Sequence, residues 1–299
     1  MKHLWGIDLG GTKVEGAVLE ADSHRVLSRT RMPTEQEHGY QHIIGQIKKL
    51  VHALEKDTGL SPERIGIGTP GSTDPRTGTM KNSNTTCLNG MKLFDDLQTA
   101  LKVPLKMAND ANCFALAETR MGIVPEVCPD AEVVFGVIMG TGVGGGVVIR
   151  NQVLNGKHGM GGEWGHTFMD ESGGPCYCGD VGCTEQVISG PALEKYYGKV
   201  SGRELKLKEI VNRYRNQSDE HATATMERLL HFFGRGLSNV INVLDPDVVV
   251  LGGGVGNIEE LYTLGVQSLE KHIFNTYFET PIVKPKLGDS AGVFGAAFL

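Results

Sequence analysis

Three cysteines and a histidine crowd into one short stretch of the chain. Cys176, Cys178 and Cys183 fall within eight residues, and His166 precedes them. One imidazole and three thiolates suit tetrahedral Zn²⁺, and in a reducing compartment such a cluster more often binds a metal than forms disulfides. We therefore predict a structural zinc site rather than inert thiols.

Two glutamates flank this cluster. Glu163 and Glu185 lie on either side of it in the sequence. Surface glutamates are usually only solvated, but two carboxylates fixed by a rigid metal loop are suited to bind the hydroxyls of a sugar. We keep both interpretations at this point.

Three glycine-rich turns follow apolar segments. They come after Asp8, at residues 140–146 and at residues 252–254, and two of them carry Thr12 and Thr141. Glycine lets backbone amides approach a phosphate closely. One such turn more often closes a hairpin, whereas three together predict phosphate binding. The pattern matches neither the Walker loop nor the dinucleotide-binding fingerprint.

Two aspartates complete the set of groups that could do chemistry. Asp8 ends the first apolar segment, where it can bind Mg²⁺ through water or cap the turn amides. Asp110 follows Asn109 at a strand-to-helix junction, where the pair serves either as a helix N-cap or as a general base with its neighbour. A phosphate cradle, a cation and a carboxylate together indicate phosphoryl transfer.

The elements that position these residues follow from apolar periodicity. We predict strands over 4–9, 14–19, 26–31, 64–68 and a segment ending at 106–110, and helices over 40–58 and 111–120. The opening pattern then recurs as a strand over 133–139, a glycine turn over 140–145, a strand over 146–150 and the start of a third at 153–154. A helix over 226–244 leads to a strand over 248–251, and a short helix spans 292–299. This recurrence predicts two related α/β domains built by duplication.

Composition narrows the class of protein. The 299 residues carry 29 Lys+Arg against 35 Asp+Glu, a formal net charge of −6, with 40% hydrophobic residues. That hydrophobic content excludes a disordered chain. The negative net charge argues against sequence-independent binding of nucleic acid. No apolar stretch is long enough for a membrane span, and the first residues do not resemble a secretory signal. We expect a soluble cytoplasmic protein without nucleic-acid or membrane partners.

Several motifs together resemble the ROK family (repressors, open reading frames and sugar kinases) of the actin/hexokinase/Hsp70 superfamily. They lie at residues 8–13, 66–71, 109–112, 140–146, 163–166, 176–185 and 245–248. The resemblance implies an actin-like (ribonuclease H-like) ATPase fold with two related α/β domains flanking a cleft. Residues 1–110 plus 288–299 would form a small domain, and 111–287 a larger one carrying the zinc loop. It also implies ATP, Mg²⁺, a hexose and a homodimer.

The resemblance assigns roles to individual residues. Asp110 would deprotonate the sugar 6-hydroxyl. The sugar would be bound by Gly71, Asn84, Asn109, Asp110, Glu163, His166 and Glu185. The nucleotide and its phosphates would be bound by Asp8, Gly10, Gly11, Thr12, Lys13, Gly140, Thr141, Gly142, Gly253 and Gly254. His166, Cys176, Cys178 and Cys183 would bind Zn²⁺, and Asp8 would bind Mg²⁺ through water.

The preferred sugar is read from three segments. Residues 81–90 resemble the bacterial fructokinase/mannokinase branch, and residues 287–293 resemble that branch and the N-acetylglucosamine kinases. The nine-residue gap between His166 and Cys176 is closer to glucokinases and repressors. We expect a 6-kinase for fructose with mannose activity, and the alternatives are glucose and N-acetylglucosamine.

Two alternative functions, each from a different class of protein, stay open. A sugar-sensing regulator would bind without turnover. The repressor branch carries a winged-helix segment before its first phosphate motif, and because that motif starts here at Asp8 we expect a kinase. An Hsp70-like or actin-like ATPase would give no reason for the zinc cluster.

Overall fold

The computed structural model describes residues 1–299, which form two compact units. The first unit contains Met1–Asp130, Gly146–Gly162 and Lys286–Leu299, and the second contains Ala131–Gly145 and Glu163–Pro285. The division predicted after residues 110 and 287 differs from these bounds. Residues 111–130 and 146–162 pack with the N-terminal sheet because helix α3 (Asp110–Arg120) contacts both the C-terminal helix α11 (Ala291–Ala297) and strand β10 (Gln152–Val153).

The first unit is built on a five-stranded sheet. Its order is β3-β2-β1-β4-β7, with bounds Val26–Pro33, Lys13–Glu20, His3–Leu9, Ile65–Thr69 and Leu105–Asn109. The first three strands form an antiparallel meander, and β4 and β7 run parallel to β1. A small hairpin joins β5 (Ser72–Thr73) to β6 (Met80–Lys81). The strands predicted in this half are confirmed to within a few residues.

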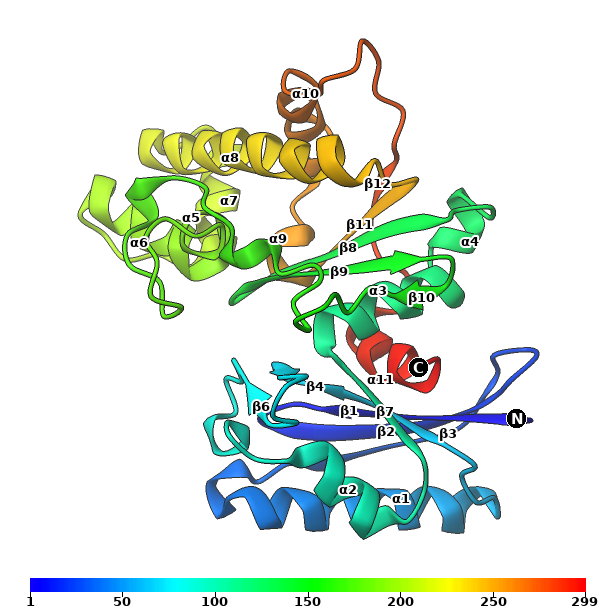
Figure 1. Ribbon diagram of the computed structural model, residues 1–299. Coiled ribbons are helices and arrows are strands. Elements are labelled where there is room, and N and C mark those ends of the chain that lie inside the picture. The colour runs from blue at the N-terminus through cyan, green and yellow to red at the C-terminus, as the bar shows by residue number, and fades with distance from the viewer. The chain divides into compact units, whose positions relative to one another are not determined.

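Helices cover both faces of this sheet. Figure 1 shows α1 (Tyr40–Thr58) and α2 (Leu93–Leu101) on one face and α11 on the other. Helix α1, predicted over the same residues, buries Ile43, Ile47, Leu50 and Leu54 against the core. These positions recur every three or four residues, which is the spacing of one helical face. A short helix α4 spans Val124–Val127.

The C-terminal helix α11 lies directly on β1 and β4. A Cβ atom at Gly66 would come within 1.7 Å of the Ala296 carbonyl oxygen, and one at Gly6 within 2.1 Å of the Val293 carbonyl oxygen. Only glycine permits this approach, because both obstacles are backbone atoms that belong to a packed helix.

Gly66→Ala is expected to destabilise the first unit by about 3 kcal/mol or more, because the methyl group must push α11 off the sheet. Gly45→Ala is the matched control: Gly45 lies within α1 with nothing within 4 Å of its added Cβ, so alanine should add up to about 1 kcal/mol of helix propensity. Urea denaturation of both variants measures the difference. Equal stability of the two variants would contradict the close packing of α11 on the sheet.

The second sheet repeats the strand order of the first. Its order is β10-β9-β8-β11-β12, with β9 at Val143–Ile149, β8 at Val133–Met139, β11 at Val248–Gly252 and β12 at Ile282–Val283. In both sheets the first three strands in sequence are sheet neighbours, and the two later strands follow on the same side. Strand β11 runs parallel to β8 and β12. The predicted duplication of topology is therefore present.

One predicted boundary in this sheet is wrong. Strand β9 begins at Val143, so Val143, Gly144 and Gly145, which were predicted in the turn, lie in the strand together with Gly146. A Cβ at Gly146 would come within 2.5 Å of the Ala111 carbonyl oxygen. A glycine run can therefore mark a strand that another backbone approaches closely, and sequence alone does not separate this case from a turn.

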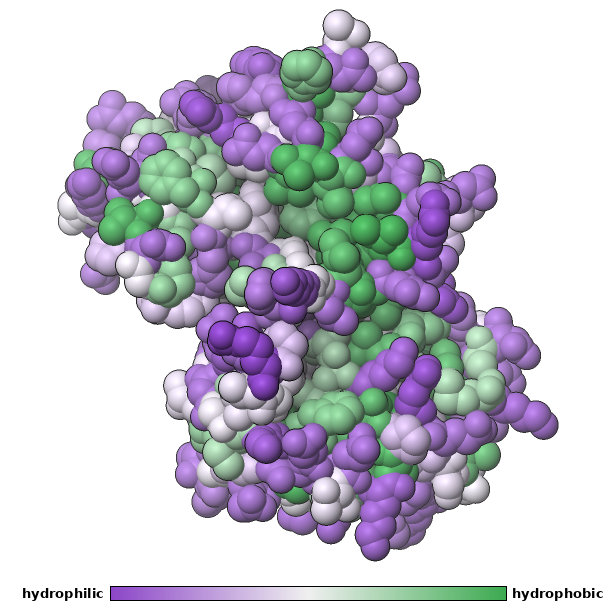
Figure 2. Space-filling model, in the orientation of Figure 1, coloured by the Kyte–Doolittle hydropathy of each residue, from purple (hydrophilic) through white to green (hydrophobic).

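Helices dominate the rest of the second unit. They are α5 (Glu185–Ile188), α6 (Gly190–Ser201), α7 (Leu207–Arg215), α8 (Glu220–Leu244), α9 (Gly253–Gly256) and α10 (Leu264–Glu270). Helix α8 starts earlier than the predicted residue 226, because the Asp219 carboxylate accepts hydrogen bonds from His221 and Ala222 N–H and caps the first turn. On the face drawn in Figure 2, apolar residues gather over the region of β11 and β12. No helix combines the length and the apolar character needed to cross a bilayer.

Candidate active site and metal centre

The carboxyl edge of the first sheet brings the predicted polar residues together. Asp8 of β1 pairs with Gly68 of β4, and Thr69 of β4 pairs with Asn109 of β7. Because these strands are parallel, their carboxyl ends lie side by side at one edge, which is where ligands bind in open α/β sheets. The side chains of Asp8 and Asn109 and the start of α3 therefore share this edge.

Of the two adjacent residues Asn109 and Asp110, only Asn109 caps the helix. Asn109 is the N-cap of α3, since its Oδ1 accepts the Asn112 backbone N–H at 2.9 Å. Asp110 is the first helical residue and its side chain is exposed, with Oδ1 accepting the Ala111 N–H at 2.8 Å. The protein atoms packed around the Asp110 carboxyl remove part of its hydration and raise its pKa, while that N–H opposes the rise. Asp110 is therefore free of the capping role.

Asp8 sits in an environment that disfavours its charge. Burial first, and then the negative charges of Asp110 and Glu15, raise the pKa of Asp8 to about 6. A Cβ at Gly292 would come within 2.8 Å of the Asp8 carboxylate, so α11 closes one side of it. Two carboxylates that repel each other at a sheet edge are the kind of oxygen donors that a hard cation such as Mg²⁺ binds.

Asp8→Asn is expected to stabilise the protein at neutral pH. The pKa of Asp8 is about 6 in the folded chain against an ordinary 3.8, so the folded state holds this proton more tightly than the unfolded state. Its contribution to stability therefore falls as pH rises from about 4 to 6, and the ionised group destabilises the fold above that window. Removing the charge should add on the order of 1–3 kcal/mol at pH 7.5 and little at pH 4.

Urea denaturation at both pH values, with the exposed Asp22→Asn as control, measures this effect. A gain of the same size at pH 4 and pH 7.5 would contradict it.

The turn after Asp8 is tight and solvent-facing. Gly10 N–H donates to the Lys13 carbonyl at 2.9 Å, and the Thr34 hydroxyl donates to the Gly10 carbonyl at 2.6 Å. Gly11 is partly exposed and Thr12 is exposed. The predicted phosphate-binding turn of the first unit is therefore formed and accessible.

The other end of α3 is anchored by a buried carboxylate. Glu118 is 0% exposed. Its oxygens accept backbone N–H groups of Ile123 at 2.9 Å, Lys286 at 3.0 and 3.1 Å, and Leu287 at 2.9 Å. Such charge-assisted bonds are stronger than neutral ones. Lys286 is the first residue of the C-terminal segment of the first unit. These hydrogen bonds connect it to α3, the helix that begins at Asp110.

In the second unit, two glycine turns meet at the carboxyl ends of β8 and β11. A Cβ at Gly140 would lie 3.8 Å from the Gly254 backbone nitrogen. Gly253 has φ +81°, and a Cβ there would come within 2.2 Å of the Met139 carbonyl oxygen, so this turn requires glycine. Thr141 is exposed between Gly140 and Gly142. The arrangement brings the backbones of the two turns close together.

Glu185 supports the first of these turns. Its Oε2 accepts the Val143 N–H at 3.0 Å, and a Cβ at Gly142 would come within 2.5 Å of the same oxygen. The Gly190 N–H donates to the Gly140 carbonyl at 2.9 Å. The loop that carries the cysteines is thereby joined to the predicted phosphate turn.

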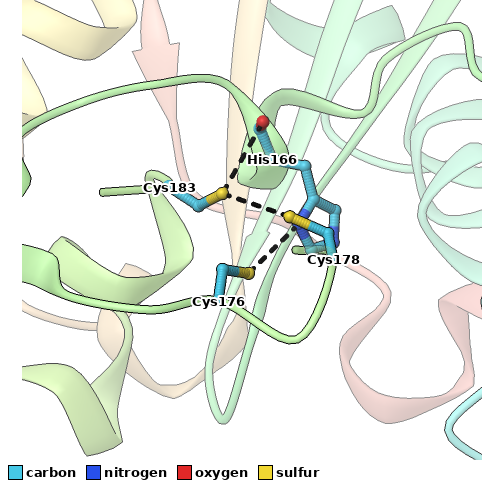
Figure 3. Close-up of side chains that lie close together, drawn as sticks. All are labelled: His166, Cys176, Cys178 and Cys183. Atoms are coloured by element: carbon cyan, nitrogen blue, oxygen red, sulfur yellow. Dashed lines mark hydrogen bonds between the residues drawn. The ribbon is translucent and has the colours of Figure 1, made fainter. Parts of the chain in front are cut away.

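The four predicted metal ligands converge (Figure 3). The ligand atoms of His166, Cys176, Cys178 and Cys183 all lie within 4.8 Å of one another. Cys176 Sγ is 3.7 Å from His166 Nδ1, and Cys178 Sγ is 3.5 Å from Cys183 Sγ. The backbone N–H of Asp180 lowers the pKa of Cys178, which favours the thiolate that binds metal. This donor set fits tetrahedral Zn²⁺.

The two nitrogens of His166 face different partners. Nδ1 points to the thiols, while Nε2 forms a hydrogen bond with the Tyr177 hydroxyl at 2.8 Å. Burial and the charges of Glu185, Cys176 and Glu163 raise the pKa of Tyr177 to about 12. Tyr177 therefore lies among the predicted sugar-binding residues of the second unit. It was not among the residues predicted from sequence, although its place between two metal cysteines was a signal.

The remaining predicted residues occupy the first unit. Asn84 is exposed on the segment after β6. Gly71 has φ +81°, and a Cβ there would come within 2.5 Å of the Lys81 carbonyl oxygen. A cavity of about 240 Å³ next to Asn109 is lined partly by residues that sequence reasoning missed, among them Asn112 and Asn155. The predicted site residues thus form two clusters, one on each unit.

Comparison with known proteins decides the family. The model of the ROK family matches residues 4–299. The chain belongs to the ROK family. An N-acetyl-D-glucosamine kinase from Aliivibrio fischeri is 33% identical, with 99% of this chain and 98% of that protein covered.

Two solved structures of ROK proteins confirm the predicted actin-like ATPase fold. The ROK hexokinase from Thermus thermophilus is 32% identical with a TM-score of 0.88, and covers 99% of this chain and 97% of its own. A ROK family glucokinase from Streptomyces griseus, solved in complex with glucose and AMPPNP, is 27% identical with a TM-score of 0.76, and covers 99% and 98%.

Proposed function

We propose that this ROK protein is an ATP-dependent kinase that phosphorylates a hexose-type sugar at the 6-hydroxyl. The observation that carries the proposal is Asp110: an exposed carboxylate at the carboxyl edge of the sheet, with a raised pKa, and relieved of helix capping by Asn109. A raised pKa suits a group that must take a proton near neutral pH.

Different residues would carry out the separate parts of phosphoryl transfer. Asp110 accepts the proton of the 6-hydroxyl as that oxygen attacks the terminal phosphorus of ATP, and ADP leaves. The backbone amides of the glycine turns are suited to stabilise the phosphate charge. These turns contain Gly10, Gly11, Thr12, Lys13, Gly140, Thr141, Gly142, Gly253 and Gly254. Mg²⁺, when bound, would neutralise phosphate charge, and Asp8 is its proposed anchor.

On the second unit, Glu163, His166 and Glu185 would bind sugar hydroxyls. His166 would offer Nε2 to a sugar hydroxyl while Nδ1 would bind the metal, because Nε2 faces the Tyr177 hydroxyl and Nδ1 faces the Cys176 thiol. Zn²⁺, when bound, would hold this loop in place. Asn84, Gly71 and Asn109 would contact the sugar from the first unit.

For the sugar we propose N-acetyl-D-glucosamine first. Relatives named N-acetyl-D-glucosamine kinases reach 34% identity over 99% of this chain. Glucose is the second candidate, favoured by the similarity to the Streptomyces griseus glucokinase solved in complex with glucose and AMPPNP. The fructose preference expected from residues 81–90 is therefore replaced by N-acetylglucosamine, which the sequence left open as an alternative.

An ADP-release assay with N-acetylglucosamine, glucose, mannose and fructose tests the proposal. We expect kcat/KM for N-acetylglucosamine to exceed that for fructose at least roughly tenfold, the size of about one lost hydrogen bond, and phosphorus NMR of the product to place the phosphate at position 6. ADP release with none of these sugars, together with sugar-induced thermal stabilisation, would instead indicate a sugar sensor. Cytoplasmic location and a homodimer stay predictions, and sedimentation analysis tests the latter.

A further inference from the structure

One segment of the second unit exposes two aromatic side chains. It connects α10 to β12 and projects beyond both α10 and α8 (Figure 1). Phe274 is 96% exposed and Tyr277 is 64% exposed. Single exposed apolar residues are common in soluble proteins. Two aromatic rings three residues apart on a projecting segment are instead typical of a surface that binds another protein.

Hydrogen bonds to the end of α8 fix this segment. Asn242 donates from Nδ2 to the His272 carbonyl at 3.0 Å, and its Oδ1 accepts the Phe274 backbone N–H at 2.9 Å. Further along, the Thr280 hydroxyl donates to the Pro246 carbonyl at 3.0 Å. A binding segment that is fixed before association loses less conformational entropy when it binds. The fold therefore presents the Phe274 ring to solvent in a position suited to association.

A pocket of about 420 Å³ lies on the same surface, lined by this segment and by the end of α8. Ile241, Ile273 and Phe278 contribute apolar groups to its wall, and Asp245 and Glu279 contribute carboxylates. A cavity of about 150 Å³ is already large enough to bind benzene. One surface therefore carries both an exposed aromatic ring and a pocket that can accept such a ring.

The charges on this surface are complementary as well. Lys271 lies three residues before Phe274, whereas Asp245 and Glu279 belong to the pocket. These three charged residues are exposed and form no ion pair within the chain. An aromatic ring next to a basic side chain matches an acidic pocket in both shape and charge.

We propose that this surface, which consists of residues 271–280 with Asn242 and Asp245, is the interface between two copies of the chain, each placing Phe274 in the pocket of the other. A twofold axis requires a self-complementary surface of this kind. The two aromatic rings expose on the order of 300 Å², a substantial part of the about 800 Å² that each partner buries in a standard interface. The family resemblance implies a homodimer without indicating its surface, and the inference does not depend on the kinase function.

Sedimentation velocity over a dilution series of the full chain tests the proposal. For Phe274→Glu we expect the dissociation constant of the dimer to rise roughly thirtyfold or more, which is the effect of a hot-spot residue. The circular dichroism spectrum should be unchanged, because the Phe274 ring has almost no contacts within the chain. Val127→Glu, at an exposed apolar position on α4 of the first unit, is the control and should dimerise like the wild type.

A charge exchange tests the mutual fit of the two copies. Lys271→Glu should weaken the dimer roughly three- to tenfold, because symmetry repeats the lost attraction twice. Adding Glu279→Lys to that variant should restore association. A monomeric wild type, a dimer that Phe274→Glu does not weaken, or a charge exchange without recovery would overturn the proposal. A wild type that dimerises through this surface but releases no ADP with any sugar would support the interface and overturn only the kinase function.

Discussion

Asp110→Asn is expected to lower the rate of phosphoryl transfer by roughly 10²–10⁴-fold, the usual contribution of a general base. The amide is close in size to the carboxylate but cannot accept the proton of the attacking hydroxyl. The backbone that positions it should persist, because Asn109 rather than Asp110 caps α3. Sugar binding, measured by calorimetry, should therefore change little while ADP release nearly stops.

The pH profile adds a second readout. Because its surroundings raise the pKa of Asp110, the base becomes protonated at a higher pH than an ordinary aspartate, and the rate of the wild type should fall on the acid side through that raised pKa. The residual rate of Asp110→Asn should lack this limb. Asp130→Asn, an exposed aspartate of the first unit, serves as control. Turnover near the wild-type level in Asp110→Asn would refute the role of Asp110.

Cys178→Ser is expected to abolish metal binding and with it the order of the second unit's loop. Wild-type protein should contain about one zinc per chain, since His166, Cys176, Cys178 and Cys183 supply four ligand atoms within 4.8 Å of one another. Without the metal, the thiols no longer hold residues 166–183 together, and the support that Glu185 gives to Val143 N–H is lost. We expect a loss on the order of 3–5 kcal/mol, or about 10 °C in Tm.

Metal analysis and calorimetry of Cys178→Ser and of the wild type treated with a chelator measure this effect. Cys128→Ser, at a cysteine outside the cluster, should keep both metal and Tm. A wild-type protein that binds no zinc, or a Cys178→Ser variant as stable as the wild type, would remove the basis for a zinc-organised sugar loop.

Local patterns were enough to predict the ligand cluster and most elements. Cys176, Cys178 and Cys183 are so close in sequence that few loop conformations keep them apart, and His166 joins them through the bridge between Phe168 and Cys183. Apolar runs that end in glycine predicted strands β1, β4, β8 and β11. The site residues lie at the carboxyl ends of these strands. Such predictions succeed because they depend on neighbours within about ten residues.

Features that depend on distant backbone could not be read from sequence. Gly146 of β9 is required by the approach of the Ala111 backbone, 35 positions earlier in the chain. The burial of Asn112 Oδ1 without a hydrogen-bond partner depends on the packing of the folded chain. The contact of Tyr177 with His166 depends on how the cysteine loop folds back. Each is a tertiary effect that overrides the local pattern.

The carboxylate of Glu118 fixes the position of the C-terminal end of helix α3. It lies eight residues, or about 12 Å along the helix axis, from Asp110, and it fastens the far end of that helix to Lys286 and Leu287. Because Glu118 and Asp110 belong to the same helix, we expect a shift at Glu118 to displace Asp110 as well. Deep mutational scans of this enzyme should therefore reveal variants at Glu118 that bind their ligands but turn over slowly, which a map of ligand contacts alone would classify as neutral.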